Sequence, residues 1–144
     1  SVFENSTSAD AGIFHGYTYS AHPVGAAAVC ACLSETQRIS TKDNAGVRGK
    51  QLYEGIQRLK KKFDVIGDVR GGQGLMAAIE VVSDPNKKTP MDMDTMKKLH
   101  QKTYEAGAMV RLGLNNILMS PPLVISEAEI DQILDALDYG FSSI

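Results

Sequence analysis

The feature that most constrains the fold is a pair of short apolar runs on either side of a glycine-rich tetrapeptide. Val65–Arg70 and Leu75–Val82 are partly β-branched, and Gly71-Gly72-Gln73-Gly74 separates them. This arrangement predicts two strands joined as a hairpin. The glycines do not fit a phosphate-binding P-loop, because Leu75-Met76 and a strand follow where that motif requires Lys-Ser/Thr and a helix.

Three further stretches have the signals of helices. An alanine-rich run follows His22-Pro23 and continues, with a break near Ser40–Asn44, to Phe63; proline suits a first helical turn and alanine has a high helix propensity. The stretch "MDMDTMKKLHQKTYEAG" reads as a helix closed by Gly107. In "SEAEIDQILDALDYGF", Ser126 and Glu129 have the spacing of a capping box. An apolar stripe is expected on the second part of the first stretch, at Val47, Leu52, Ile56, Leu59 and Phe63.

Two more short strands complete the pattern. They are expected in "AMVRLG" and "NILMSPPLVI", joined by a tight Gly-Leu-Asn-Asn connection, whereas "DPNKKTP" reads as a polar loop. The order is loop, helix, helix, strand, strand, helix, strand, strand, helix. It predicts an α+β fold in which helices cover a small antiparallel or mixed sheet, preceded by a helical arm.

Composition excludes several classes of function. The 144 residues suit one domain, or one small domain and part of another. With 15 basic and 17 acidic side chains the net charge is −2, and no basic block indicates a nucleic-acid partner. The longest apolar run, Val24–Leu33, is too short to span a membrane and is expected to form a buried helix.

The two cysteines, Cys30 and Cys32, lie two residues apart on that helix and face different sides. They cannot form a sensible local disulfide, and no metal partners lie at ligand spacing. Buried, reduced thiols are therefore expected, which suits the cytoplasm. The N-terminal stretch has no secretory signal and begins as though cut from something longer.

No complete catalytic set and no metal site is visible, but two partial features remain. Tyr17-Thr18 precede a helix, where backbone N–H groups and a hydroxyl could bind an anion such as phosphate; a plain helix cap is the alternative for Thr18. Arg111 is a lone cation between apolar segments, and it either forms a structural salt bridge or binds a ligand carboxylate. His100, with no acidic residue three or four positions away, reads as a surface or edge histidine.

Three blocks carry a family resemblance: "FHGYTYSAHPVGAAAVCACL", "VRGGQGLMAAIEVVSD" and "GAMVRLGLNNILMSPPLVISEAEIDQILDAL". In order and spacing they resemble the last third of class III aminotransferases, which are pyridoxal-phosphate enzymes of fold type I. The likeness covers essentially the whole chain. His22-Pro23 resembles the omega-amino-acid:pyruvate transaminase branch, although Ala21 stands where glycine is usual.

The resemblance implies an organisation and a set of roles. Residues 1–21 would be a loop at the end of the large cofactor-binding domain, residues 22–62 connecting helices, and residues 63–144 the small C-terminal domain. In a homodimer, Thr18 with its neighbour Tyr17 would bind the phosphate of the pyridoxal phosphate held by the other subunit. Arg111 would receive the carboxylate of a substrate, in a reaction between an amino donor and an oxo-acid acceptor.

The family's Schiff-base lysine lies upstream of the first block. The lysines at positions 42, 50 and 60–62 follow that block, so none corresponds to it. The chain by itself is therefore expected to contain no catalytic residue and to be inactive. Two alternatives stay open: an aminomutase or other non-transaminase of the same superfamily, and a non-catalytic stand-alone module.

Overall fold

The computed structural model describes residues 16–144. Residues 1–15, most of the loop predicted for residues 1–21, lie outside this described part. The chain divides into two units, one ending at Glu35 and the other comprising Thr36–Ile144. Each unit is described by itself below.

Helix α1 (Pro23–Arg38) begins where the sequence predicts a first helical turn. The side chain of His22 caps it, because Nδ1 accepts a hydrogen bond of 3.2 Å from the Gly25 backbone N–H. The helix ends before Ser40, whose φ of 51° is left-handed, and the next helix starts at Thr41. The predicted break in the helical stretch is confirmed.

The predicted burial of α1 is wrong. None of its described residues is buried, and Cys30 and Cys32 are both exposed. The run Val24–Leu33 is helical, but its side chains point to several sides of the helix and each of its residues is exposed. None of the helices in residues 16–144 has the length and the apolar character that crossing a membrane requires.

The second unit contains a sheet in which all pairings are antiparallel. The strands β1 (Ile66–Arg70), β2 (Ala77–Asp84), β5 (Asn116–Met119) and β4 (Arg111–Gly113) lie in the order β1-β2-β5-β4. The predicted β1–β2 hairpin and the tight β4–β5 connection are therefore confirmed. A short strand β3 (Thr89–Pro90) pairs with the end of β2, inside the stretch expected to be only a loop. Proline is tolerated there because it lies at a sheet edge.

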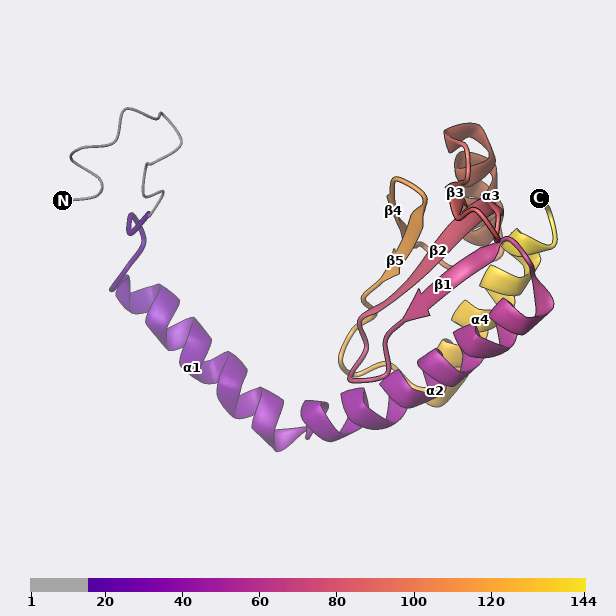
Figure 1. Ribbon diagram of the computed structural model, residues 1–144. Coiled ribbons are helices and arrows are strands. Elements are labelled where there is room, and N and C mark those ends of the chain that lie inside the picture. Colours follow the sequence, from indigo (N-terminus) through magenta and orange to yellow (C-terminus); the bar gives the residue numbers. More distant parts are fainter. Residues whose placement is uncertain (1–15) are drawn as a thin grey trace, which may run out of the picture. The chain divides into compact units, whose positions relative to one another are not determined.

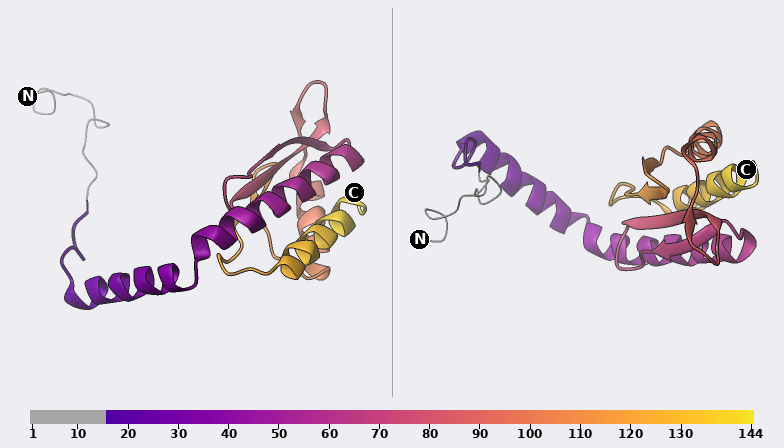
Figure 2. Two further views of the ribbon diagram at one scale, coloured as in Figure 1. Left: turned by 90° about the horizontal axis from the view of Figure 1, so that it is seen from below. Right: turned by 45° about the horizontal axis from the view of Figure 1, so that its top comes forward.

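Three helices complete this unit: α2 (Thr41–Lys62), α3 (Met93–Glu105) and α4 (Glu127–Phe141). Helix α2 packs against β1, β2 and α4, while α3 packs against α4 and β4 (Figures 1 and 2). The predicted capping box at Ser126 and Glu129 is present. The predicted α+β architecture is thus confirmed.

The core lies between one face of the sheet and the helices α2, α3 and α4. Leu52 and Ile56 of α2 are fully buried, as their place in the predicted stripe requires. Val47 is an exception, since 57% of its surface is exposed. The other core residues that are fully buried are Ile79, Val81, Val82, Met96, Leu99, Ile117, Ile130 and Leu137.

Candidate functional site

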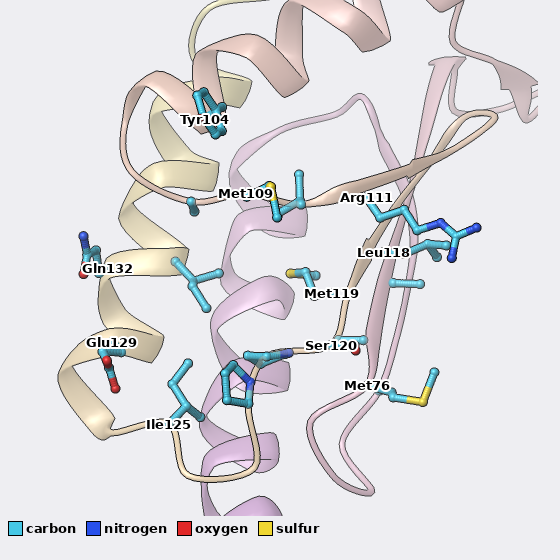
Figure 3. Close-up of a pocket in the computed structure, with 18 of the residues that line it drawn as sticks. Met76, Tyr104, Met109, Arg111, Leu118, Met119, Ser120, Ile125, Glu129 and Gln132 are labelled. Atoms are coloured by element: carbon cyan, nitrogen blue, oxygen red, sulfur yellow. The ribbon is translucent and has the colours of Figure 1, made fainter.

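Arg111 is the first residue of β4, and its side chain is exposed. Its Cα pairs with that of Leu118 on β5, and Figure 3 shows the two side chains next to each other. Among residues 16–144 the Arg111 guanidinium has no hydrogen-bond or ion-pair partner. The salt bridge considered from the sequence is therefore absent from the described part of the chain.

The pairing register puts a second arginine on the same face of the sheet. Arg70 pairs with Ala78, Ala78 with Leu118, and Leu118 with Arg111, so these four residues form one row across the sheet. Successive residues of a strand point to opposite faces. The neighbouring row faces the core and consists of Val69, Ile79, Ile117 and Leu112. The row with the two arginines therefore lies on the face opposite the core.

The two arginines differ in their partners. The Arg70 guanidinium donates to Asn116 Oδ1 at 2.6 Å and to Asp68 Oδ2 at 3.4 Å. Asp68 also lies 3.6 Å from Lys60 Nζ. Because Arg70 is paired and Arg111 has no partner in the described part of the chain, Arg111 is the charged side chain of this row that is available to a ligand. A guanidinium can hold a carboxylate through two parallel hydrogen bonds.

The surface around Arg111 is an open hollow rather than a closed pocket. Its volume of about 1460 Å³ exceeds the 300–1,000 Å³ that is usual for a small-molecule site. Met76 and Met109, which line it, are 80% and 83% exposed (Figure 3). Large apolar side chains gathered at an exposed hollow are typical of a surface that another protein part covers.

Glu129 also lines this hollow, but it belongs to the capping of α4. The backbone N–H and the hydroxyl of Ser126 donate to its carboxylate at 2.8 and 2.7 Å, and these hydrogen bonds lower the pKa of Glu129 below its ordinary value. A carboxylate held in this way is poorly suited to accept or deliver a proton. Within residues 16–144 there is no group of three or more His, Cys, Asp or Glu side chains that could hold a metal ion.

Tyr17 and Thr18 share one turn ahead of α1, in which the Ser20 backbone N–H donates to Tyr17 O at 2.9 Å. The Thr18 side chain is exposed and makes no hydrogen bond within the described residues. The alternative that Thr18 caps the helix is wrong, because His22 occupies the cap. An exposed hydroxyl is a donor that fits a phosphate oxygen, so the residues present are compatible with a phosphorylated cofactor.

The predicted site residues fall into two sets. Tyr17 and Thr18 lie together in the first unit, and Arg111 lies in the second.

The sequence analysis missed the helix cap formed by His22, although a histidine directly before a proline at the first helical position was a usable signal. It also missed the hydrogen bond of 2.9 Å between His100 Nε2 and Val110 O, for which the sequence has no local signal.

The fold matches solved transaminases. An amine transaminase from an uncultivated Pseudomonas species, solved in its PLP-bound form, superposes with a TM-score of 0.83 at 36% identity, over 98% of this chain and 32% of that one. An (S)-enantioselective omega-transaminase from Thermomicrobium roseum superposes with a TM-score of 0.79 at 34% identity, over 92% of this chain and 30% of that one. The chain therefore has the fold of part of a transaminase.

The family follows from the sequence comparison. The model of the family "Aminotransferase class-III" matches residues 2–139, and the chain belongs to this family. Its members depend on pyridoxal phosphate, as the resemblance implied.

Three relatives show the range of the family. Alanine–glyoxylate aminotransferase 2 homolog 2 of Arabidopsis thaliana is 33% identical over 88% of this chain and 27% of its own length. Taurine–pyruvate aminotransferase of Bilophila wadsworthia is 32% identical over 83% of this chain and 28% of its own length. Leucine/methionine racemase of Thermococcus litoralis is 30% identical over 90% of this chain and 29% of its own length. The chain thus spans less than a third of the length of each of these relatives.

Proposed function

We propose that this chain is the C-terminal part of a transaminase that moves an amino group from an omega-amino acid or amine to pyruvate or a similar oxo-acid. The observation that carries the proposal is the guanidinium of Arg111, which lies on the exposed face of the sheet and has no partner among residues 16–144. The names of two similar proteins, a taurine–pyruvate aminotransferase and an omega-transaminase, support the choice of substrates.

In this proposal each predicted residue binds rather than reacts. Arg111 holds the carboxylate of the oxo-acid acceptor, and the Thr18 hydroxyl, with Tyr17 in the same turn, holds the phosphate of pyridoxal phosphate across a homodimer interface. The cofactor supplies the electron sink that stabilises the carbanion of the substrate. Residues 1–21 belong to the large domain, residues 22–62 connect the domains, and residues 63–144 form the small domain. Without the large domain and its lysine, the chain alone is inactive.

The first test replaces Arg111 with alanine in the full-length protein. Loss of charge-assisted hydrogen bonds, worth about 1.5–3 kcal/mol, should raise KM for pyruvate by roughly 10-fold to 100-fold. KM for a primary amine without a carboxylate should stay near the wild-type value and serves as the internal control. Steady-state kinetics with both substrates measures the difference. Equal changes in the two KM values would argue against this role of Arg111.

The second test replaces Thr18 with alanine and, as a matched control, with serine. Thr18→Ala removes the hydroxyl and should weaken retention of pyridoxal phosphate, whereas Thr18→Ser keeps the donor and should retain the cofactor. Absorbance of the bound cofactor after dialysis measures both. An alanine variant that holds the cofactor as tightly as the wild type would contradict the assignment.

One finding favours a second candidate. The similarity to a leucine/methionine racemase shows that related chains are also found in non-transaminases. An aminomutase or other non-transaminase of the same superfamily therefore remains the alternative. Transfer of an amino group to pyruvate separates the two, because only a transaminase forms alanine from that acceptor.

A further inference from the structure

His100 makes a contact that neither its neighbours in sequence nor the proposed function explains. It lies half-buried on α3, and its Nε2 is 2.9 Å from the backbone oxygen of Val110. A carbonyl oxygen can only accept, so Nε2 carries the hydrogen and donates it. Val110 directly precedes Arg111, the first residue of β4. The imidazole is therefore bonded to the peptide group that leads into Arg111.

The backbone that receives this hydrogen bond leads from α3 into the sheet, and the side chain of Val110 is itself buried in the core. Residues 106–110 connect α3 to β4, a strand of three residues that pairs with β5 alone. At the α3 end, the Ala108 backbone N–H donates to Thr103 O at 3.1 Å. Met109 is 83% exposed and contributes little packing. Within the described residues, His100 is the side chain that donates a hydrogen bond to the backbone of this connection, and this bond adds to the burial of the Val110 side chain.

The helix that carries His100 is itself firmly placed. Leu99 and Thr103 are fully buried, and the Thr103 hydroxyl donates to Leu99 O at 2.9 Å. Gly140 of α4 lies so close that a Cβ there would overlap Thr103 Oγ1. Because α3 and α4 approach closely at this point, the donor on His100 has a defined position relative to the core.

We infer that His100 is a positioning residue for Arg111: it anchors the backbone at the start of β4, from which the Arg111 guanidinium reaches the substrate carboxylate. This inference rests on the proposed function. It adds to that function the residue, His100, that positions the carboxylate-binding side chain of Arg111. A bidentate carboxylate contact depends on the angle of the guanidinium plane. A loosened β4 start therefore weakens carboxylate binding even when Arg111 is intact.

The test uses three variants of the full-length protein. His100→Phe removes the donor and keeps a planar ring, His100→Gln keeps an N–H donor, and Lys98→Ala changes an exposed neighbour on α3 as the control. We expect His100→Phe to raise KM for pyruvate by roughly threefold to tenfold, the factor that corresponds to one net hydrogen bond, with kcat little changed. KM for a primary amine without a carboxylate, such as benzylamine, should not change. His100→Gln should recover most of the pyruvate KM, and Lys98→Ala should behave as the wild type.

A purely structural role gives a different result. If His100→Phe lowers the melting temperature but leaves the ratio of the two KM values unchanged, the inference is overturned. Hydrogen exchange provides a second readout that does not need activity: the β4 amides should exchange faster in His100→Phe than in the wild type, and equal rates also overturn the inference. The proposed function fails separately, if the wild type does not form alanine from pyruvate or if Arg111→Ala does not discriminate between the substrates.

Discussion

Helices α1 and α2 are consecutive in the chain and contrast in how their side chains are buried. The 16 residues of α1 are mostly apolar, and none is buried. The 22 residues of α2 include many charges, yet six residues, among them Leu52, Ile56 and Leu59, are buried. The comparison teaches that the distribution of apolar residues around a helix, and not their number, decides whether a small domain can bury it.

The physical reason lies in the spacing. Leu52, Ile56 and Leu59 recur at steps of four and three, so they form one stripe that the sheet covers. In α1 the large apolar residues Val24 and Leu33 are 70% and 58% exposed, and alanines and cysteines surround them. A helix that is apolar on all sides is normally enclosed by other protein. Under the proposed function, the rest of the enzyme supplies that cover.

The strongest test of this contrast truncates one leucine in each helix. Leu52→Ala removes a fully buried side chain and should lower the free energy of unfolding by about 2–5 kcal/mol. Leu33→Ala should change it by less than about 0.5 kcal/mol in this chain, because the side chain is exposed. Urea unfolding measures both. A cost for Leu33→Ala close to that of Leu52→Ala would show that α1 is packed and would remove the contrast.

A pair of glycines tests the packed face of α2 against its exposed face. A Cβ at Gly49 would overlap the backbone of Gly74, so Gly49→Ala should destabilise the protein by about 1–3 kcal/mol. A Cβ at Gly46 meets no atom within 4 Å, and Gly46→Ala should stabilise the protein by about 0.5–1 kcal/mol through its higher helix propensity. Thermal unfolding of both variants measures the difference. If Gly49→Ala and Gly46→Ala changed the stability of the protein in the same direction, this result would contradict the described packing.

The smallest effects concern the helix caps of the two units. Ser126→Ala removes the cap of α4 and should lower the free energy of unfolding by about 1 kcal/mol. His22→Ala should leave global unfolding unchanged, because α1 buries no side chain, and should reduce only its helix content. Circular dichroism, combined with urea unfolding, separates the two outcomes.

The cap of α4 also has a pH dependence. Hydrogen bonds from Ser126 lower the pKa of Glu129 in the folded state. The ionised carboxylate therefore stabilises the fold above its unfolded pKa, which is about 4.3, and this contribution is lost as the pH falls through the lower folded pKa. The stability difference between the wild type and Glu129→Gln should accordingly shrink on acidification from about pH 6 to pH 3. A difference that stays constant over this range would exclude the carboxylate as its source.

Short-range patterns predicted much of the fold. The β1–β2 hairpin, the capping box of α4 and the break between α1 and α2 were all predicted, because each depends on residues close together in the chain. Strand β3 was missed because its two residues pair with the end of β2 in a stretch of polar loop composition. Val47 was wrongly placed in the buried stripe, since a helical period does not tell how far along a helix its cover extends.

The candidate site was predicted only in part. The sequence singled out Arg111 but left open whether it forms a salt bridge. The structure answers this for the described residues, because the register of the sheet places Asn116 and Asp68 beside Arg70 and leaves Arg111 without a partner. The contact of His100 with Val110 was not predictable, because it depends on how the connection after α3 runs back along that helix.

The sequence by itself determined the class III aminotransferase family, the helix and strand order, and the residue types able to bind a phosphate or a carboxylate. The tertiary structure alone decided which of two arginines has no partner among residues 16–144, which histidine donates to Val110 O and which of two consecutive helices is buried. The reason is physical. Periodicity and capping are interactions between near neighbours in the chain, whereas the partner and the burial of a side chain depend on which distant segments pack against it.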